Sequence, residues 1–368
     1  MGIRVLHVVT YMGRGGLETM IMNYYRHIDR KKIQFDFLVH RDFQADYDKE
    51  ILELGGHIYH VPLLNPFSPG YFKALNSFFS EHRYDIVHSH LDCLSAYPLK
   101  IADKYGVRTR IAHAHNSDQN HDLKYLIKAY SKRLIPRYAT DFFASSRMAG
   151  EWMFPGQRFK ILKNAIDAKQ YIFQPEKEKK MKEKLGVQNK FVIGHVGRFH
   201  PQKNHSFLID VFQCIQEIEK EAVLILIGSG EDLTKIEAKV KKLNLDDKVF
   251  FLGNRNDISD LLQALDVFVF PSLYEGYGMA AAEAQAAGLS CVLSDCVPWE
   301  CKLTENVEFL SLDMSPQEWA KHIVRYKGRK KKNEFAAICG AGYDIEDNVK
   351  QLEKFYLSRG SKCLKHVY

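Results

Sequence analysis

The chain has 368 residues, 46% of them hydrophobic, and a formal net charge of +7. This length exceeds what one typical core needs and predicts two domains, whereas the lack of any run of about 18 apolar residues excludes a membrane-spanning helix. The first ten residues lack the long apolar region of a signal peptide, and seven scattered cysteines are typical of a reducing compartment. We therefore expect a cytoplasmic protein.

The basic excess is local. Residues 177–184 (KEKKMKEK) mix both charges and predict a solvated helix, whereas residues 327–332 (KGRKKK) are almost purely basic. Such a patch can meet nucleic acid, an anionic substrate or a membrane surface. No nucleic-acid motif accompanies it, so we expect no nucleic-acid partner. The cysteines between 291 and 301 match no zinc pattern, which favours core packing over a metal site.

Short apolar runs alternate with amphipathic helical stretches along both halves of the chain. The strands expected are 4–9, 35–40, 57–61, 85–90, 109–115, 141–146, 191–197, 223–228, 249–253, 267–271 and 290–295. A representative helix covers 206–220, with Phe207, Val211, Ile215 and Ile218 on one face.

This alternation predicts parallel sheets with helices on both faces. It occurs twice, separated by a polar, hinge-like connector around residues 164–190 that contains Pro175. The predicted fold is therefore α/β, with two doubly wound Rossmann-like domains, 1–168 and 169–344, facing each other across a cleft. A ligand would bind in that cleft, outside the carboxyl ends of the strands.

Two glycine-containing turns each follow an expected strand and precede a helix. In TYMGRGGLETM (10–20), Gly13, Gly15 and Gly16 allow the backbone to approach an anion at a helix N-terminus. It is neither a P-loop nor a dinucleotide fingerprint, since Glu18 occupies the third glycine position, and a plain turn explains it equally well. IGSGED (227–232) also lacks a third glycine, which favours a structural turn.

The segment HVGRFHPQKNHSF (195–207) predicts an anion site. Arg198 and Lys203 flank a loop at the carboxyl end of a strand, and Asn204 is a suitable N-cap for the next helix. Two cations beside a helix N-terminus can hold a diphosphate, with bidentate contacts from the arginine. The alternative is a pair of solvated surface cations.

The segment YEGYGMAAAEAQAAG (274–288) predicts a strand, a loop and a helix capped by Gly288. Glu275 begins the helix and cannot ligate phosphate, but it can accept hydrogen bonds from hydroxyls. Glu283 lies on the Ala-rich side, which we expect to be buried, so it needs partners such as ribose hydroxyls. A nucleotide-sugar satisfies both acids. The alternatives are a surface charge for Glu283 and a favourable helix-end acid for Glu275.

Histidines gather in VHSH (87–90) and AHAH (112–115), both expected at strand ends that face the cleft. Period two places His113 and His115 on one face of their strand. A pair at this edge predicts binding or proton handling, while a core role is the alternative. The chain has no H-E-x-x-H motif and no Ser-His-Asp pattern.

Together these motifs resemble the retaining glycosyltransferases of family 4, which have the GT-B architecture, and in particular the bacterial exopolysaccharide and capsule enzymes. The resemblance spans nearly the whole chain. It is carried by GRGGLET, IAHAHNS, ILKNAIDAKQY (with Ala165 where glycine is commoner), GRFHPQKN and, most specifically, the E-x7-E element of 275–283. Residues 343–357 resemble the closing helix of the family, which implies that 345–368 cross back to the first domain.

The resemblance also implies roles for individual residues. The donor-binding set would be Gly15, Gly16, Arg198, Lys203, Arg255, Glu275, Gly276, Tyr277, Gly278, Met279 and Glu283. Within it, Arg198 and Lys203 would hold the diphosphate, Glu283 the ribose and Glu275 the transferred sugar. Gly15 and Gly16 would approach the diphosphate, the amides from Gly276 to Met279 would contact the sugar and phosphate, and Arg255 would lie near the base. The catalytic set would be His115, Glu275, Arg198 and Lys203, with His113 as the alternative histidine.

The function expected is transfer of a sugar from a nucleotide-sugar, with UDP favoured weakly, and retention at the anomeric carbon. Cations and helix amides would stabilise the leaving diphosphate, so we expect neither metal nor cofactor. The acceptor would be a glycan or an undecaprenyl-diphosphate-linked sugar, reached from an anionic membrane surface at the inner face of the cell membrane. The sugar, base, linkage and oligomeric state stay open. A nucleotide-sugar epimerase, an NAD-dependent oxidoreductase with two Rossmann domains and a silent binding partner remain as alternatives.

Overall fold

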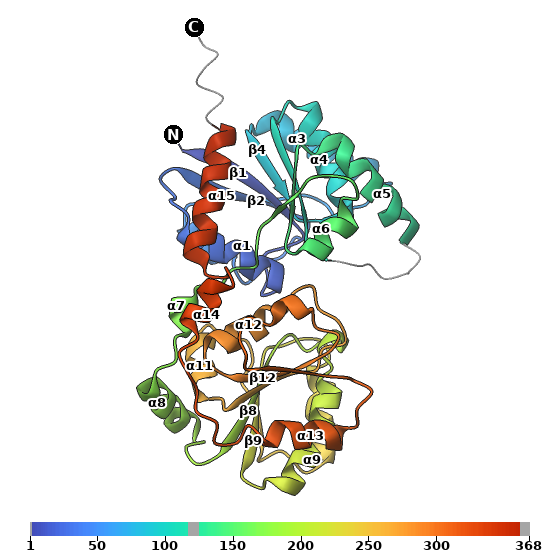
Figure 1. Cartoon of the computed structure of the whole chain (residues 1–368). Helices are drawn as coiled ribbons and strands as arrows, with labels where there is room; N and C mark the ends of the chain where they lie inside the picture. Colours follow the sequence, from blue (N-terminus) through green and yellow to red (C-terminus); the bar gives the residue numbers. More distant parts are fainter. Residues whose placement is uncertain (1, 117–124, 361–368) are drawn as a thin grey trace. The chain divides into compact units, whose positions relative to one another are not determined.

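The computed structural model describes residues 2–116 and 125–360. Contacts between Cα atoms divide this chain into two compact units (Figure 1). The described part of the first comprises residues 2–116, 125–165 and 345–360, and the second comprises Ile166–Asp344. None of the described helices is long and apolar enough to cross a lipid bilayer.

The described part of the first unit has a seven-stranded parallel sheet in the order β3-β2-β1-β4-β5-β6-β7. The strands are β1 (Ile3–Val9), β2 (Ile33–Val39), β3 (Ile58–His60), β4 (Ile86–Ser89), β5 (Thr109–Ala114), β6 (Asp141–Ala144) and β7 (Lys160–Ile161). The helices are α1 (Gly16–His27), α2 (Asp48–Glu53), α3 (Pro69–Glu81), the 3-10 helix η1 (Asp92–Ser95), α4 (Ala96–Lys104), α5 (Tyr125–Tyr138), α6 (Arg147–Met153) and α15 (Ile345–Gly360).

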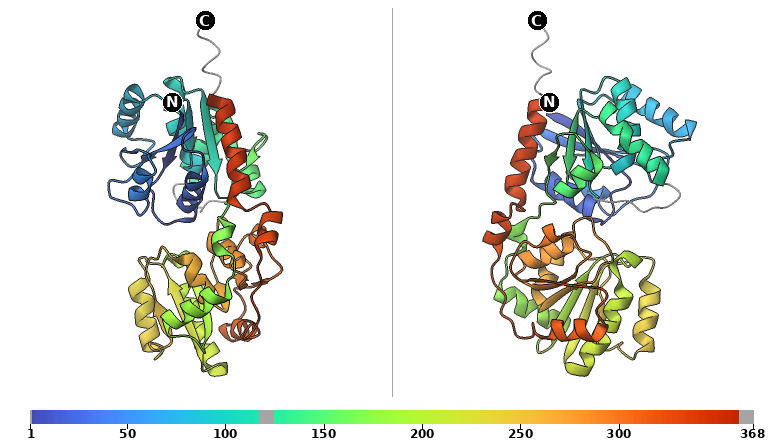
Figure 2. Two further views of the ribbon diagram at one scale, coloured as in Figure 1. Left: turned by 90° about the vertical axis from the view of Figure 1, so that its left-hand side faces the viewer. Right: turned by 45° about the vertical axis from the view of Figure 1, so that its right-hand side comes forward.

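Alternation along the strands sorts this sheet into two buried faces. On β1, Val5 and Val9 pack in a core with α1 and α15, while Leu6 and Val8 pack in a second core with α3, α4 and α6. Helix α15 lies along this sheet near α1, as Figures 1 and 2 both show. Its return to the first unit confirms the predicted closing helix. Residues 361–368, which the sequence also assigned to that helix, lie outside the described residues.

The described second unit has a six-stranded parallel sheet in the order β10-β9-β8-β11-β12-β13. The strands are β8 (Phe191–Val196), β9 (Ala222–Ile227), β10 (Val249–Phe251), β11 (Val267–Phe270), β12 (Ser290–Ser294) and β13 (Val307–Leu310). The helices are α7 (Ala168–Tyr171), α8 (Pro175–Leu185), η2 (Pro201–Lys203), α9 (His205–Ile218), α10 (Leu233–Lys242), α11 (Ile258–Ala264), α12 (Met279–Ala286), η3 (Trp299–Cys301), α13 (Pro316–Val324) and α14 (Phe335–Gly340). One face is covered by α9, α10 and α13, and the other by α8, α11 and α12.

All the expected strands are present, and each end lies within two residues of its predicted position. The sequence did not predict β7, which has only two residues with exposed side chains, or β13, whose four residues include Glu308. The representative helix is α9, but its predicted apolar face was wrong at one position. Ile218 is 52% exposed at the helix end, whereas Val211 and Ile215 are fully buried.

The expected polar connector is more ordered than its composition suggested. Pro175 occupies the first turn of α8, where its missing N–H costs nothing, and α8 is the solvated helix predicted for 177–184, with Met181 as its buried residue. Its Lys182 pairs with Asp266 at 2.7 Å. The connector therefore contributes two helices, α7 and α8, to the second unit.

The basic run 327–332 does not form a uniformly exposed patch. The side chain of Lys331 is only 4% exposed, and its Nζ lies 3.0 Å from Oε1 of Glu178. Burial lowers the pKa of Lys331, while Glu178 acts in the opposite direction. Lys327 pairs with Glu219, and Arg329 donates to Asn306. Much of the charge in this run therefore has a partner within the second unit.

Candidate functional site

The loop that carries Arg198 lies against the turn after β9. The Phe199 N–H donates to Ser229 O at 2.8 Å, and the Asp232 N–H donates to Phe199 O at 3.0 Å. A Cβ on Gly228 would overlap the carbonyl of Gly197, and both Gly228 and Gly230 have positive φ, at 138° and 155°. IGSGED is therefore a structural turn, as expected. Its glycines allow two backbones to touch beside the exposed Arg198.

Lys203 and Glu275 come from the two segments that the sequence assigned to one donor. The Lys203 Nζ lies 2.6 Å from Glu275 Oε1, and the side chains are 18% and 7% exposed. The ammonium also lies 4.6 Å from the centre of the Phe270 ring. The structure thus brings Lys203, from segment 195–207, into contact with Glu275, the first acid of segment 274–288. This pair is a charge-assisted contact in a largely desolvated site.

Gln202 ties the same two loops together through its backbone and its side chain. Its carbonyl accepts the Leu273 N–H at 2.8 Å, and its Nε2 donates to Tyr274 O at 2.8 Å. The predicted cap at Asn204 was wrong in its mechanism. Asn204 precedes α9 but has left-handed backbone geometry, with φ at 54°, and its side chain makes no capping hydrogen bond.

Helix α12 places Glu283 in the core, as predicted from its Ala-rich face. Gly278 precedes the helix with φ at 91°, and Gly288 follows it with φ at 76°. Glu283 is 9% exposed. Burial raises its pKa to about 7, and a hydrogen bond with the Tyr171 side chain acts in the opposite direction. The surface-charge alternative is therefore wrong, and this carboxyl is available to change its charge near neutral pH.

Two further donor candidates make contacts that the sequence did not indicate. The Tyr277 ring is 5% exposed and stacks on Tyr343, with centroids 5.2 Å apart and an interplanar angle of 14°. Arg255 makes a bidentate contact with Asp257, at 2.8 Å and 2.6 Å. Met279 begins α12 after Gly276 and Gly278 and is 8% exposed.

Gly15 and Gly16 lie in the first unit, where β1 ends and α1 begins, as the sequence predicted. Gly15 is the N-cap and Gly16 is the first helical residue. The Glu18 carboxylate folds back beside Gly15, where it occupies the space that a Cβ would need. An acid in the first turn is favourable at the positive end of α1.

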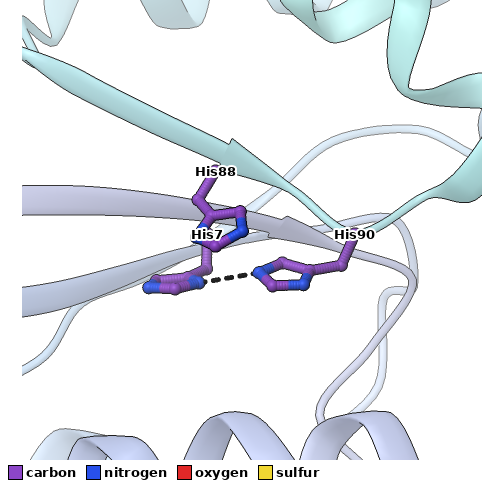
Figure 3. Close-up of side chains that lie close together, drawn as sticks. All are labelled: His7, His88 and His90. Atoms are coloured by element: carbon purple, nitrogen blue, oxygen red, sulfur yellow. Dashed lines mark hydrogen bonds between the residues drawn. The ribbon is translucent and has the colours of Figure 1, made fainter. Parts of the chain in front are cut away.

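Five histidines line the face of the first sheet that packs with α1 and α15. His7 comes from β1, His88 and His90 from β4 and the residue after it, and His113 and His115 from β5 and the residue after it. Figure 3 shows His7 and His88 on neighbouring strands, with the His90 ring turned toward His7. Burial lowers the pKa of all five, so the rings are neutral at physiological pH.

Hydrogen bonds join these rings into two rows. In the first row, His7 Nδ1 lies 2.9 Å from His90 Nε2, and His90 Nδ1 lies 3.0 Å from His115 Nε2. In the second row, the Tyr356 hydroxyl lies 2.7 Å from His88 Nδ1, and His88 Nε2 lies 3.1 Å from His113 Nδ1. Tyr356 belongs to α15, so the C-terminal helix completes the second row.

The two candidate histidines therefore differ. His113 is 1% exposed and lies within the core, which fits the core role given as the alternative. His115 follows the end of β5 and is partly exposed, and its backbone N–H donates to Asp92 Oδ1 at 2.8 Å. Of the two, His115 is the one that can reach a ligand.

The cluster also offers the nitrogen ligands that metals such as zinc accept. Ring nitrogens of His7, His88 and His90 lie within 4.8 Å of one another, as do those of His90, His113 and His115. A metal must lie in the plane of every imidazole that binds it, because the lone pair lies in that plane. The rings of His88 and His90 stack at 4.3 Å and 24°, so their planes are nearly parallel and one ion close to both rings cannot lie in both planes. The rows fit hydrogen bonding better than metal coordination.

Sequence reasoning missed His7, Gln202, Asp257, Tyr171 and Phe270. The odd position of a histidine in the apolar strand 4–9 was the one available signal for His7, because period two places it on the same face as Val5 and Val9. Gln202, Tyr171 and Phe270 act across contacts between segments distant in sequence, which leave no local pattern, whereas Asp257 contacts Arg255 only two positions away.

Two parallel-sheet Rossmann-like units, with paired Arg/Lys and E-x7-E segments in the second, define a GT-B glycosyltransferase. The chain belongs to glycosyltransferase family 4. Residues 14–170 match the family described as Glycosyltransferase Family 4, and residues 176–338 match Glycosyl transferases group 1. The protein is therefore a glycosyltransferase, and the oxidoreductase alternative is excluded.

Relatives of known name cover most or half of the chain. The putative glycosyltransferase EpsF of Bacillus subtilis is 35% identical over 96% of both chains. The capsular polysaccharide biosynthesis glycosyltransferase CapH of Staphylococcus aureus is 25% identical over 97% of this chain and 99% of its own. The Escherichia coli UDP-Gal:alpha-D-GlcNAc-diphosphoundecaprenol alpha-1,3-galactosyltransferase is 30% identical over 54% of both.

Among solved structures, Anabaena Alr3699/HepE in complex with UDP and glucose is similar in fold. It has a TM-score of 0.80 and 20% sequence identity, and the match covers 97% of this chain and 100% of the other.

Proposed function

We propose that this glycosyltransferase moves a sugar from a UDP-sugar to a glycan or an undecaprenyl-diphosphate-linked acceptor in exopolysaccharide or capsule biosynthesis, with retention at the anomeric carbon. The observation that carries the proposal is the contact between Lys203 and Glu275, together with the burial of Glu283. The names of the relatives support the donor and acceptor classes. The solved complex with UDP and glucose supports a nucleotide-sugar on this fold.

In this proposal, binding of the donor separates Lys203 from Glu275, and each side chain then contacts the donor. The diphosphate, which carries more negative charge than one carboxylate, takes Lys203, and Arg198 adds a second cation from the loop beside Gly228. Glu275 is then free to accept hydrogen bonds from hydroxyls of the transferred sugar. Glu283 binds the ribose, amides from Gly276 to Met279 contact the sugar and phosphate, Gly15 and Gly16 approach the diphosphate, and Arg255 lies near the base.

The chemistry follows from where charge develops. As the anomeric bond breaks, negative charge grows on the diphosphate, and preorganised cations and amides stabilise it. We propose that no metal and no cofactor take part. The acceptor attacks from the face that the leaving group departs from, and the leaving phosphate takes the acceptor's proton. His115 positions the donor sugar through a hydrogen bond to one of its hydroxyls.

The test is a panel of nucleotide-sugars, scored by the rise in melting temperature of the protein. A ligand at about 100 times its dissociation constant adds about 2.7 kcal/mol to the free energy of unfolding. The donor found in this way is then supplied with acceptors, and the anomeric configuration of the product is read by NMR. An inverted product would refute retention. Sugar interconversion without any acceptor would instead favour the epimerase alternative.

We further propose that the protein works from the cytoplasm at an anionic membrane surface through α5. The positions 126, 130, 133 and 137 form one stripe of this helix. Leu126 and Tyr130 are 76% and 61% exposed, and Arg133 and Arg137 are exposed along the same stripe. Apolar and basic side chains on one helical face suit an interface of anionic lipid. This helix is a better candidate than the basic run 327–332, where several charges have partners.

A further inference from the structure

In the row formed by His7, His90 and His115, the number of available protons couples the tautomers of the two end rings. A neutral imidazole carries one N–H, so it can donate from only one of its two nitrogens. His90 uses both nitrogens, with His7 on Nε2 and His115 on Nδ1. It must donate to one neighbour and accept from the other. The whole row therefore has two possible states, and the tautomer of His7 dictates that of His115.

The two states leave different atoms at the ends of the row. In one state, His115 donates from Nε2 toward His90, and His7 carries an N–H on Nε2. In the other, His7 donates from Nδ1, His90 donates from Nδ1, and the proton of His115 lies on Nδ1. Nε2 of His7 is buried without a hydrogen-bond partner among the described residues, and its ring lies 4.2 Å from that of Phe35.

The far end of the row selects between these states. A buried backbone N–H without an acceptor is rarer in proteins than an incompletely filled backbone acceptor, and we apply the same preference to the imidazole N–H. The favoured state therefore leaves His7 Nε2 as a bare lone pair. We propose that His90 is a positioning residue that fixes the proton of His115 on Nδ1.

The consequence lies at the exposed end of the row. With Nε2 of His115 engaged by His90, Nδ1 is the nitrogen that a bound ligand can meet. The proposed tautomer makes that nitrogen a donor, which matches the hydrogen bond to a sugar hydroxyl in the proposed function. This last step rests on the proposed function, whereas the coupling of the three rings does not.

The second row supplies a matched control. His88 is buried, hydrogen-bonds at both nitrogens and lies on the same sheet face, but its row ends on His113. His90→Phe and His88→Phe each remove a buried ring with similar loss of packing. Only His90→Phe releases Nε2 of His115 from its hydrogen bond.

The experiment measures imidazole 15N chemical shifts in the full-length protein with 15N-labelled histidine, assigned by His115→Gln. We expect His115 to be protonated on Nδ1 in the wild type and in His88→Phe. In His90→Phe the population should move toward Nε2–H, the form that free imidazole side chains favour in water. An Nε2–H tautomer of His115 in the wild type, or no change in His90→Phe, would overturn the proposal. So would one equivalent of zinc in the purified protein by elemental analysis.

Kinetics supply the second measurement, with UDP affinity as the check on folding. His90→Phe should lower the turnover of sugar transfer or donor hydrolysis about tenfold, the value of one lost hydrogen bond, with little change in KM for the donor. His88→Phe should change turnover less than about twofold. Equal losses in both variants would mean that packing alone matters. A tautomer change with no nucleotide-sugar activity in any variant would support the coupling and refute the proposed function.

Discussion

Lys203 Nζ lies 2.6 Å from Glu275 Oε1, although the two residues are 72 positions apart in the chain. Both side chains are largely removed from solvent, so each needs the other until a ligand arrives. A diphosphate that binds Lys203 must therefore break this contact, which lowers its binding affinity. Substitutions of the two residues should then affect UDP and the intact UDP-sugar differently.

We predict that Lys203→Ala weakens UDP and the UDP-sugar together and lowers turnover about 10²–10³-fold, because it removes a cation from the developing charge. Glu275→Gln should leave UDP affinity unchanged or tighter, because Lys203 no longer has a competing carboxylate, while it weakens the intact UDP-sugar. Calorimetric titration of both variants with both ligands measures the difference.

The matched control is Lys239→Ala, which removes a cation that lies 2.6 Å from Asp210 in the same unit. It should leave both affinities unchanged. Identical losses for Lys203→Ala and Glu275→Gln with both ligands would show that the pair acts only in folding.

Glu283 should make stability depend on pH. Its pKa is raised to about 7 in the folded protein, so the folded state holds its proton more tightly than the unfolded chain does. Its stabilising contribution is complete below about pH 4.5 and is lost as the pH rises to about 7. At most the loss is on the order of 3 kcal/mol.

Glu283→Gln removes this loss of stability at high pH, because a glutamine side chain does not titrate. We expect the variant to melt at a higher temperature than the wild type at pH 8 and at a similar temperature at pH 5, while its affinity for UDP falls. Thermal unfolding at both pH values measures the first effect and UDP titration the second. The exposed Glu237 supplies the control Glu237→Gln, which should leave both properties unchanged. A variant less stable than the wild type at pH 8 would contradict the prediction.

Gly228→Ala should displace the loop that carries Arg198. The new Cβ would overlap the carbonyl of Gly197, and φ at 138° is unfavourable for alanine. We expect a loss of at least about 2 kcal/mol in stability and weaker UDP binding. Gly340→Ala is the control, because its Cβ would meet no atom within 4 Å. Unfolding in urea and UDP titration compare the two, and normal UDP affinity in Gly228→Ala would show that the loop tolerates the shift.

The membrane proposal predicts which surface matters. A variant with Leu126→Ser, Tyr130→Ser, Arg133→Gln and Arg137→Gln should lose flotation with anionic vesicles at low salt. The two arginines alone contribute about 2 kcal/mol. Lys330→Gln with Lys332→Gln, in the exposed part of the basic run, should retain most binding. High salt should weaken the wild type. The opposite ranking of the two variants would place the contact on the second unit.

The sequence by itself determined the fold, because parallel strands buried on both faces are continuous apolar runs that stand out from amphipathic helices. It missed β7 and β13, whose two and four residues are too short and too polar for a periodic pattern. It also predicted the burial of Glu283, since alanines on either side make that helix face apolar.

Only the tertiary structure decided which charges meet. Lys331 reads as surface charge in KGRKKK, yet it is buried against Glu178 because α8 passes beside it. The row from His7 to His115 joins three segments that are neighbours only in the sheet order β1-β4-β5. Local periodicity fixes the face on which a residue lies. The partner on that face depends on how strands distant in sequence are ordered in the sheet, and no short-range pattern encodes that order.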